Sequence, residues 1–470
     1  MEYQPTIGLE IHAELKTLTK MFCDSLNDPD EKHPNTNVCP VCLGHPGTLP
    51  FINKKAVEAV IRVGLALGGE IAKTTKFDRK NYFYPDLPKG YQISQYDMPL
   101  VKGGELLGVR IRRVHLEEDT GTLIHDEKSG ASLVDFNRAG VPLMELVTEP
   151  DINDAEDAVK FAKEFQLILR YLGVSSANME KGEMRVEVNI SLNMGTKVEL
   201  KNINSFKAVE SATAYEIKRQ KEALELGEKI KQETRGWDDV KKITVSQREK
   251  EEAHDYRYFP EPDLPPFTTA EFEPERLKAE LPELPAARRE RFKKEYDLPT
   301  TKTEMLVVEP ELAKFFEEAV SELRAENPSA QTDTLFNYLT SDLRGLMNET
   351  GVGFGEPKIN PEHLAHIARL VDDSKITSRQ AKDILREMFE TGLDPEVIMA
   401  EGGFSVVKEG ETFESAVKKV INENPAAVAD YKKGKEASLQ FLIGQTMKEL
   451  KGKGHPEMIK KAILHELVSS

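Results

Sequence analysis

The segment Ile7-Gly8-Leu9-Glu10-Ile11-His12-Ala13-Glu14-Leu15 alternates strictly between two kinds of side chain. An apolar residue stands at every odd position, and a period of two is that of a half-buried β-strand. The other face carries Glu10, His12 and Glu14. The segment therefore predicts a sheet strand with one face on a core and one face rich in ionisable groups.

Helix signals follow this strand. Asn53 predicts the start of one helix, and Asn153-x-x-Glu156 has the spacing of a capping box before a second one. The apolar residues of that second helix recur three and four positions apart, which is typical of a helix packed on a core. They are Ala158, Phe161, Phe165, Ile168, Leu169 and Leu172.

Residues 185–201 predict a β-hairpin, because two runs of alternating apolar and polar residues flank a short loop. The loop ends in Gly195, which we expect in the left-handed conformation. In this register Asn189 lies opposite Glu199. Glu187 and Glu199 then become diagonal neighbours on the polar face of the hairpin.

After the hairpin, the sequence pattern changes from mixed strands and helices to a proline-rich segment and then to helices. Proline is too dense between Phe259 and Phe267 for regular structure. Because Pro282 and Pro285 follow, we place the end of the mixed region near residue 290. Helical patterns follow, with starts at Pro310, at Asn360-Pro361 and at Thr377 or Ser378. The sequence thus predicts an α+β protein with a mixed-sheet domain (1–290), a helical domain (291–405) and a small helical tail domain (406–470).

The net charge excludes some functions. The 470 residues include 64 Lys and Arg against 81 Asp and Glu, a formal net charge of -17, which argues against a protein that coats DNA. Residues 431–470 hold eight Lys and four Glu, so this tail is +4 and the rest of the chain is -21. A local contact between the tail and a nucleic acid is compatible with that distribution.

Cysteine content and hydropathy indicate the compartment. Three cysteines in a chain of this length suit a reducing cytoplasm and exclude a disulfide scaffold. No apolar run has the length of a membrane span, and the first residues show no signal-peptide pattern. We therefore expect a cytoplasmic protein with no membrane partner.

Carboxylates are the main candidates for chemistry. A P-loop, a dinucleotide-binding G-x-G-x-x-G and a nucleophile elbow are all missing from the sequence. Glu10 and His12 share one strand face, and Glu187 and Glu199 share another. Such oxygen ligands bind Mg²⁺ and bridge it to phosphate. Alternating charge is also common on the solvated face of antiparallel strands, and the pattern alone favours that interpretation over a metal site.

The three cysteines form a second candidate site. Cys39 and Cys42 make a CxxC motif, and Cys23 lies upstream of it. A CxxC is half of a zinc site and needs two further ligands. Cys23 supplies one thiol, and His33 or His45 would complete the set. Buried free thiols on a turn are the alternative.

Two basic segments are candidates for nucleotide and RNA contacts. Within residues 77–86, Arg79, Lys80 and Tyr82 would stack on an adenine or a terminal nucleotide and neutralise phosphate, although aromatic clusters more often belong to a core. The tail lysines are either a phosphate-contacting patch or a solvated helix face. They are Lys432, Lys433, Lys435, Lys448, Lys451 and Lys453.

Long motifs run through the chain from end to end. They are GLEIH (8–12), FDRKNYFYPDLPKGYQISQ (77–95), HLEEDTG (115–121), NRAGVP (137–142), ELKNINSF (199–206), DYRYFPEPD (255–263) and FLIGQTMK (441–448). In this order they resemble the B subunits (GatB family) of the aspartyl/glutamyl-tRNA amidotransferases. The resemblance implies a cradle-like catalytic domain over 1–290 and a tRNA-binding tail.

The reaction implied by the resemblance repairs misacylated tRNA and belongs to the carbon–nitrogen ligases that use glutamine as amide donor (EC 6.3.5.-). ATP phosphorylates the side-chain carboxylate of Glu-tRNA(Gln) or Asp-tRNA(Asn), and ammonia then displaces the phosphate. A carboxylate needs this activation because oxide is a poor leaving group. The resemblance implies a Mg²⁺ cofactor and assigns its catalytic ligands to Glu10, His12, Glu118, Glu145, Glu187 and Glu199.

The resemblance also implies partners. The Ser-Ser-Lys signature of the amidase A subunit is missing from this sequence. The resemblance therefore implies that a separate A subunit supplies the ammonia and that a small C subunit accompanies both chains. Many family members have a C-x-C motif before the CxxC, and Ser25 replaces the second cysteine of that motif here. Whether the remaining cysteines bind zinc is therefore left open.

Two other functions are alternatives. A noncatalytic tRNA-binding scaffold would need the basic tail but not the carboxylate set. A free-standing metal-dependent phosphohydrolase would need neither the tail nor a partner. The sequence does not distinguish Glu-tRNA(Gln) from Asp-tRNA(Asn) as the substrate.

Overall fold

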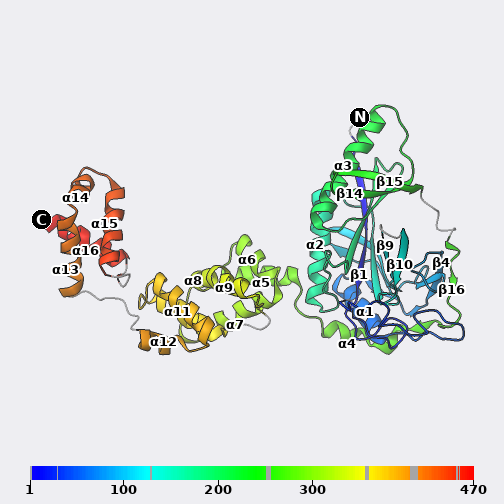
Figure 1. The fold of residues 1–470 in the computed structure, drawn as a ribbon, viewed down its shortest axis with the longest axis horizontal. Helices are drawn as coiled ribbons and strands as arrows, with labels where there is room; N and C mark the ends of the chain where they lie inside the picture. The colour runs from blue at the N-terminus through cyan, green and yellow to red at the C-terminus, as the bar shows by residue number, and fades with distance from the viewer. Residues whose placement is uncertain are drawn as a thin grey trace. The chain divides into compact units, whose positions relative to one another are not determined.

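A computed structural model describes residues 3–28, 30–126, 130–249, 256–354, 359–402, 411–450, 454 and 456–469. The chain divides into two compact units, residues 1–288 and 289–470. The first combines a large sheet with helices, and every regular element described in the second is helical, which confirms the α+β class (Figure 1). The expected boundary between 405 and 406 lies outside the described residues.

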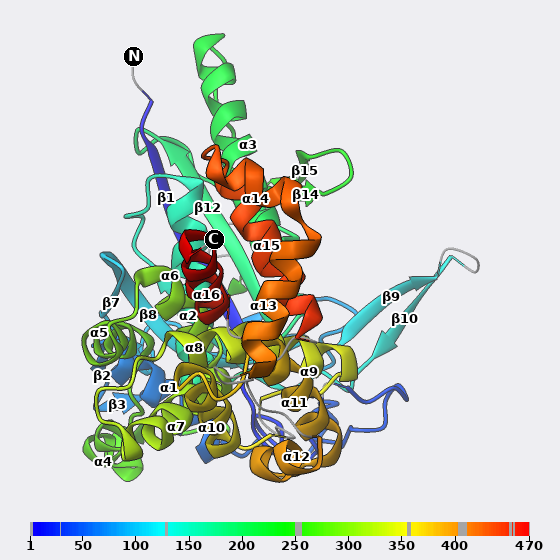
Figure 2. The same ribbon diagram turned by 90° about the vertical axis from the view of Figure 1, so that its left-hand side faces the viewer.

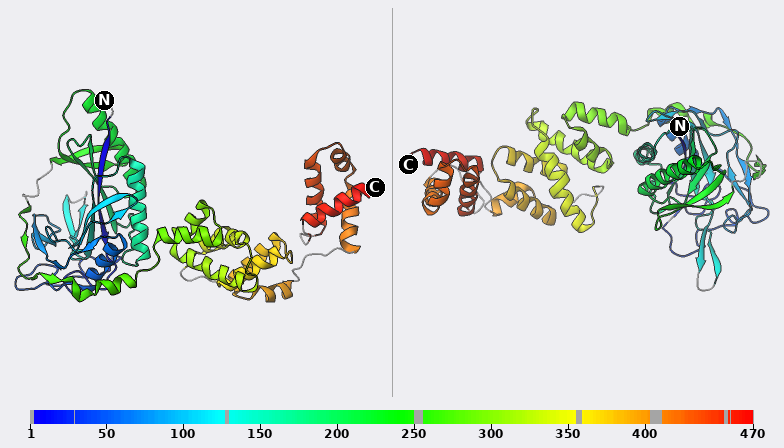
Figure 3. Two further views of the ribbon diagram at one scale, coloured as in Figure 1. Left: turned by 180° about the vertical axis from the view of Figure 1, so that it is seen from behind. Right: turned by 90° about the horizontal axis from the view of Figure 1, so that it is seen from above.

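A ten-stranded mixed sheet forms the centre of the first unit. Its strand order is β15-β14-β13-β12-β1-β11-β8-β6-β2, with β7 beside β8, and β13 and β14 form its parallel pair. β1 is the dark-blue strand near the middle of the sheet (Figure 1 and Figure 3). The bounds are β1 Pro5–Glu14, β2 Glu70–Ile71, β6 Val101–Lys102, β7 Glu105–Leu106, β8 Val109–Glu118, β11 Pro142–Thr148, β12 Met184–Leu192, β13 Val198–Lys201, β14 Glu233–Asp238 and β15 Ile243–Glu249.

Helices α1 (Lys54–Ala66), α2 (Ala155–Tyr171) and α3 (Phe206–Glu225) cover one face of this sheet. The odd-numbered apolar residues of β1 join the helices in a single hydrophobic core, as the alternation in its sequence predicts. Because side chains alternate along a strand, the even-numbered residues face the opposite side. That polar face carries the pocket described below.

Smaller strands form separate sheets beside the large one. β16 (Phe259–Pro260), β4 (Asp78–Asn81) and β5 (Tyr91–Ser94) form a three-stranded sheet, and β17 (Phe267–Thr268) pairs with β3 (Thr74–Thr75). The proline-rich segment therefore contains two short strands that we did not expect. β9 (Thr122–Asp126) and β10 (Ala131–Asp135) form a hairpin that projects from this unit (Figure 2).

The predicted hairpin exists as β12 and β13, and its register confirms Asn189 opposite Glu199. The turn differs from the expectation. Asn193 and Met194, with φ of 53° and 56°, adopt the left-handed conformation, whereas Gly195 does not. The connection spans the residues between Leu192 and Val198, so it is longer than the three-residue loop that would have required a left-handed glycine.

Most of the predicted helix starts are confirmed. Asn53 caps α1 through its side chain, but the cap of α2 is Asp154, one residue after the predicted Asn153. The Asp154 carboxylate accepts a hydrogen bond of 2.7 Å from the backbone N–H of Asp157, and a carboxylate at this end also complements the helix dipole. The Thr377 side chain and Gln380 form a capping box at the start of α11.

The described regular elements of the second unit are α-helices and one π-helical segment, Tyr338–Leu343. α7 begins at Pro310 and α10 at Pro361, as predicted. The helices of the C-terminal part bury a small apolar core of their own. Within the described part of the chain, no helix is both long and apolar enough to cross a membrane.

The remaining helical bounds complete the chain. They are η2 Thr269–Phe272, α4 Pro274–Ala279, α5 Pro285–Tyr296, α6 Thr300–Val307, α7 Pro310–Glu326, α8 Asp333–Asn337, η3 Tyr338–Leu343, α9 Arg344–Thr350, α10 Pro361–Asp372, α11 Ser378–Thr391, α12 Pro395–Gly402, α13 Glu411–Glu423, α14 Pro425–Lys432, α15 Glu436–Glu449 and α16 Pro456–Ser469.

Candidate active site

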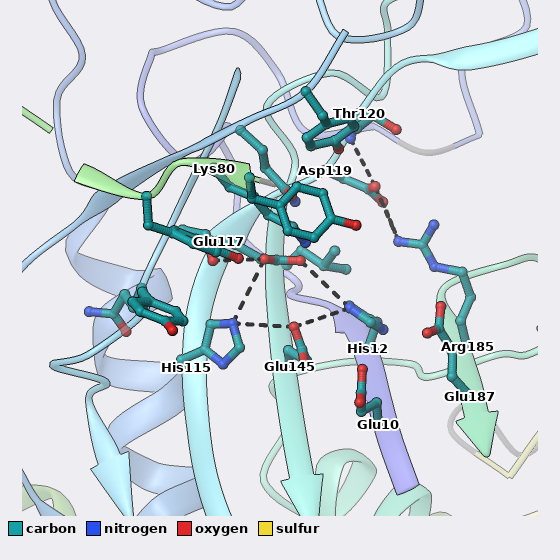
Figure 4. Close-up of a pocket in the computed structure, with 18 of the residues that line it drawn as sticks. Glu10, His12, Lys80, His115, Glu117, Asp119, Thr120, Glu145, Arg185 and Glu187 are labelled. Atoms are coloured by element: carbon teal, nitrogen blue, oxygen red, sulfur yellow. Dashed lines mark hydrogen bonds and ion pairs between the residues drawn. The ribbon is translucent and has the colours of Figure 1, made fainter. Parts of the chain in front are cut away.

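A pocket of about 400 Å³ lies on the polar face of the large sheet, and its accessible lining is mainly polar. Side chains from β1, β8, β11, β12 and β13 form its floor, and β4 contributes to its wall. Figure 4 shows how these side chains converge from neighbouring strands. Two groups of potential cation ligands lie in this pocket.

The first group consists of His12, Glu117 and Glu145, whose ligand atoms lie within 4.8 Å of one another. Strand pairing brings them together, because Glu145 on β11 lies between His12 on β1 and His115 on β8. The Glu145 carboxylate is 3.4 Å from His12 Nε2 and 3.2 Å from His115 Nε2 (Figure 4). Ser94 donates a hydrogen bond of 2.9 Å to Glu117.

Charges in the first group shift one another's protonation. Burial lowers the pKa of His12, but Glu145 and the other carboxylates outweigh it and raise that pKa to about 9. Burial raises the pKa of Glu145, yet His115 and His12 hold it well below its usual range. The group therefore contains an ionised carboxylate and a protonated imidazole at neutral pH, and a divalent cation would replace the imidazole proton.

The second group consists of Glu10, Glu187 and Glu199, again with ligand atoms within 4.8 Å of one another. Glu10 and Glu187 are direct partners across β1 and β12, and Glu199 follows on β13. Lys201 Nζ lies 2.9 Å from a Glu187 oxygen and 4.0 Å from Glu199 Oε1. The predicted proximity of Glu187 and Glu199 is thus confirmed.

Two neutral side chains orient this second group. Asn189 Nδ2 donates a hydrogen bond of 2.9 Å to Glu10 Oε1. Thr234 Oγ1 donates a bond of 2.7 Å to Glu199 Oε2. Among the described residues, Asn189 Oδ1 meets no hydrogen-bond partner although Asn189 is only 9% exposed. A buried amide oxygen in this position is suited to a cation or a water bound to one.

Glu118 is not part of either group, contrary to the expectation. Its carboxylate accepts bonds from Lys89 Nζ at 2.8 Å and from the Ile93 backbone N–H at 2.9 Å, on the other side of the strand. The neighbouring Glu117 points into the pocket instead, because adjacent residues of β8 face opposite ways. His115 and Glu117 are two positions apart on one strand, so the sequence could have predicted that they share a face.

The adjacent basic residues of β4 also point to different sides. Lys80 and Tyr82 line the pocket, and Lys80 Nζ lies 5.2 Å from the ring centre of Tyr256. Burial lowers the pKa of Lys80, but the nearby carboxylates raise it overall. Arg79 points away from the pocket and makes two hydrogen bonds of 2.7 Å to Glu261, so it is not placed to contact a ligand there.

Further pocket residues were missed by sequence reasoning. Arg185 Nη2 lies 3.0 Å from Asp119, and both line the pocket beside Lys201. Strand alternation places Arg185 on the same face as Glu187, which would have identified it. Asp119 follows the last residue of β8, and only the tertiary structure brings it to Arg185.

The three cysteines come together outside this pocket. Their sulfur atoms lie within 4.8 Å of one another, with Ser25 Oγ 3.8 Å from Cys42 Sγ. Lys20 Nζ is also 3.8 Å from Cys42 Sγ. A hydrogen bond with Cys23 and the charge of Lys20 lower the pKa of Cys42 to about 4, so a thiolate is present at neutral pH.

Among the described residues, the cluster of three sulfur atoms includes neither His33 nor His45. His33 Nδ1 lies 2.9 Å from Glu31, and its side chain is exposed. His45 lines a cavity that Cys23 and Cys42 also line. The described residues thus bring together three thiols and the Ser25 hydroxyl, rather than the set completed by His33 or His45 that the sequence suggested.

The described tail lysines are exposed. Lys432, Lys433 and Lys435 lie around the end of α14, and Lys435 Nζ is 3.0 Å from Asp430. Lys448 lies in the last turn of α15, whose buried residues face the core of the tail. Lys451 and Lys453 lie outside the described residues.

Comparison with known families identifies the class of this protein. Residues 5–273 match the GatB/GatE catalytic domain, and residues 314–467 match the GatB domain. The first match contains the whole pocket, and the second covers the described tail helices as far as residue 467. The chain thus combines a domain of the GatB/GatE catalytic type, which carries the pocket, with a GatB domain.

Curated relatives narrow the class further. The B subunit of the aspartyl/glutamyl-tRNA(Asn/Gln) amidotransferase of Caldanaerobacter subterraneus is 48% identical over 99% of this chain and 100% of the relative. Those of Thermomicrobium roseum and Thermotoga maritima are 48% and 46% identical, each over 98% of both chains. The chain belongs to the GatB family, the B subunits of the aspartyl/glutamyl-tRNA amidotransferases. As such it is part of a multi-subunit ligase of protein biosynthesis.

Proposed function

We propose that this chain uses ATP to phosphorylate the side-chain carboxylate of Glu-tRNA(Gln), Asp-tRNA(Asn) or both, and then exchanges the phosphate for ammonia. In the first step the carboxylate oxygen attacks the γ-phosphorus and ADP leaves. In the second, ammonia attacks the acyl carbon and inorganic phosphate leaves with the activated oxygen. The observation that carries this proposal is the presence of two adjacent cation-ligand groups in one pocket with lysine and arginine side chains.

The ligand groups fit Mg²⁺. All three donors of the second group are carboxylates, and two of the three in the first group are. The buried Asn189 Oδ1 adds a neutral oxygen without a protein partner among the described residues. Mg²⁺ prefers such oxygen donors and, when bound, neutralises charge on transferring phosphoryl oxygens. Glu117 replaces Glu118 in the ligand set that the sequence implied.

The protein's own cations would position the phosphates. Lys80 and Arg185 line the same pocket, and a raised pKa keeps each of them protonated. Phosphoryl transfer depends mainly on such positioning and charge stabilisation. The stacked rings of Tyr96 and Tyr258, with centroids 4.3 Å apart, border the pocket and limit the access of water to an acyl phosphate.

The proposal includes partners and a second metal. Ammonia would come from an amidase A subunit, and a small C subunit would complete the complex in the cytoplasm. The tail lysines, Lys432 and Lys433 among them, would contact tRNA phosphates away from the pocket. The cluster of Cys23, Cys39 and Cys42 would hold zinc, with Ser25 or water as a weak fourth ligand.

ATP-to-ADP turnover by the reconstituted complex tests the proposed function. We expect ADP to form in the presence of Glu-tRNA(Gln) or Asp-tRNA(Asn), and not with uncharged tRNA. Ammonium ions should replace glutamine as the nitrogen source. A complex that binds these tRNAs but forms no ADP with either would support the noncatalytic scaffold instead.

A further inference from the structure

We propose that the Lys201 ammonium occupies the place of a cation among Glu10, Glu187 and Glu199, and that cation binding transfers this ammonium to a phosphate of the nucleotide. Lys201 would then couple the binding of cation and nucleotide. This inference rests on the proposed function, because it assigns a role to Lys201 within the same pocket.

The contacts of Lys201 carry the first part of the argument. Its Nζ lies 3.0 Å and 2.9 Å from the two oxygens of Glu187 and 4.0 Å from Glu199 Oε1. Both carboxylates belong to the second ligand group, whose ligand atoms lie within 4.8 Å of one another. An ammonium that is hydrogen-bonded to Glu187 and lies 4.0 Å from Glu199 neutralises part of the charge that would otherwise attract a divalent cation.

The amide of Asn189 shows that this group is incomplete with Lys201 alone. Asn189 Nδ2 is bonded to Glu10, and its buried Oδ1 has no partner within the described part of the chain. An unpaired buried carbonyl oxygen is unfavourable unless a donor or cation completes it. With Lys201 in the cation's place, Asn189 Oδ1 thus still lacks the partner that a cation, or a water bound to one, would supply.

The positive charge of Lys201 determines how it responds to a bound cation. The ammonium lies on a flexible four-carbon stem. A divalent cation that binds Glu187 and Glu199 would repel this ammonium at close range, so the Lys201 side chain would move away from these oxygens.

The pocket provides a place for the displaced ammonium. The Lys201 side chain is 31% exposed and lines the same pocket as Lys80 and Arg185. A nucleotide bound there offers phosphate oxygens that lie close to its cation. The released ammonium then exchanges carboxylate partners for phosphate partners. Cation and nucleotide consequently strengthen each other's binding, and by thermodynamic linkage they do so by the same factor.

Substitution of Lys201 gives two effects of opposite sign. In K201M we expect Mn²⁺, used as the probe cation, to bind the second group about tenfold more tightly without nucleotide, because its competitor is gone. A non-hydrolysable ATP analogue in the presence of Mg²⁺ should bind about tenfold more weakly, because one phosphate contact is lost. A merely structural role would not improve the affinity for the cation.

Calorimetric titration of the full-length chain at pH 8 measures both affinities. The E145Q background disables the first ligand group, so that the second is observed alone. K201R keeps the charge and should keep the weak cation affinity of the parent chain. K207M removes an exposed lysine of α3 outside the pocket and should change neither affinity. If K201M is unstable, K201Q makes the same test.

Each outcome separates this inference from the proposed function. If the parent chain binds Mn²⁺ and the analogue but K201M shows unchanged or weaker Mn²⁺ binding, the role of Lys201 is wrong and the proposed function stands. If K201M gains cation affinity but keeps its nucleotide affinity, the transfer to phosphate is wrong. If the parent binds neither probe, both proposals are wrong.

Discussion

Thr234 on β14 donates a hydrogen bond of 2.7 Å to Glu199 Oε2 on β13, across the parallel strand pair of the large sheet. Thr234 is 1% exposed and Glu199 is 6% exposed, so this bond is shielded from water. The other oxygen of Glu199, Oε1, lies 4.0 Å from Lys201 Nζ, and Glu199 belongs to the ligand group with Glu10 and Glu187. A residue that touches no substrate thus sets the orientation of a proposed cation ligand.

Removal of this hydroxyl should weaken cation binding. In Thr234→Val, which keeps the side-chain shape, we expect Mn²⁺ affinity of the second group to fall about tenfold, as for other residues that orient metal ligands. Thr234→Ser keeps the hydroxyl and should restore most of the affinity. Calorimetric titration checks both variants, and equal affinities in Thr234→Val and the parent chain would contradict the positioning role.

Loss of a carboxylate ligand should abolish amidation. Glu10→Gln and Glu199→Gln should each lower the rate of amide formation by about 10²-fold or more, because an amide cannot replace the charge of a cation ligand. Hydrolysis of glutamine by the A subunit should remain measurable. Near-normal amidation in both variants would exclude these residues as ligands.

The adjacent Glu117 and Glu118 should respond differently. Glu117→Gln should reduce Mn²⁺ binding to the first group about tenfold or more, because Glu117 is one of its carboxylates. Glu118→Gln should leave that affinity close to the parent value and lower the unfolding temperature, because it weakens the bonds to Lys89 and Ile93. Titration and thermal unfolding of both variants distinguish the two roles.

The protonation of His12 should make stability depend on pH in the chelator-treated chain. The pKa of His12 is about 9 in the folded chain and about 6.5 in a free histidine. A raised pKa stabilises the fold fully below pH 6.5, and this stabilisation, on the order of 3 kcal/mol, is lost as the pH rises through 9. Thermal unfolding between about pH 6 and pH 10 measures it. His12→Gln should show a flatter pH dependence, and an unchanged slope would contradict the shift.

Zinc should copurify with the chain when no chelator is used. We expect about one equivalent, bound by Cys23, Cys39 and Cys42, and its loss in Cys42→Ser. Metal analysis of both proteins makes the measurement. Zinc below about a tenth of an equivalent in the parent protein would favour three free thiols.

The tail should contribute to tRNA affinity. Deletion from residue 406 onward should raise the KM for tRNA and flatten its dependence on salt, because phosphate contacts release counterions. Charge reversal of Lys432, Lys433 and Lys435 should reproduce part of this effect without unfolding, since these side chains are exposed. Glutamine hydrolysis without tRNA should be unaffected. An unchanged KM at physiological salt would show that the tail charge is only a solvated face.

Local patterns in the sequence determined a large part of this protein. The alternation around Glu10 and His12 predicted a strand with an ionisable face, and the hairpin pattern predicted that Asn189 lies opposite Glu199. The capping residues in the sequence also predicted most of the helix starts correctly. These features depend on neighbours a few residues apart, whose geometry is set by the period of the strand or helix and by the chemistry of the caps.

Only the tertiary structure decided which groups share the pocket. His12, His115 and Glu145 lie far apart in the sequence, and the pairing of β1, β11 and β8 brings them together. The structure also selected Glu117 over Glu118. The physical reason is that a strand sends adjacent side chains to opposite faces, so a one-residue change of register exchanges the buried set, and register between distant strands depends on how the whole sheet packs.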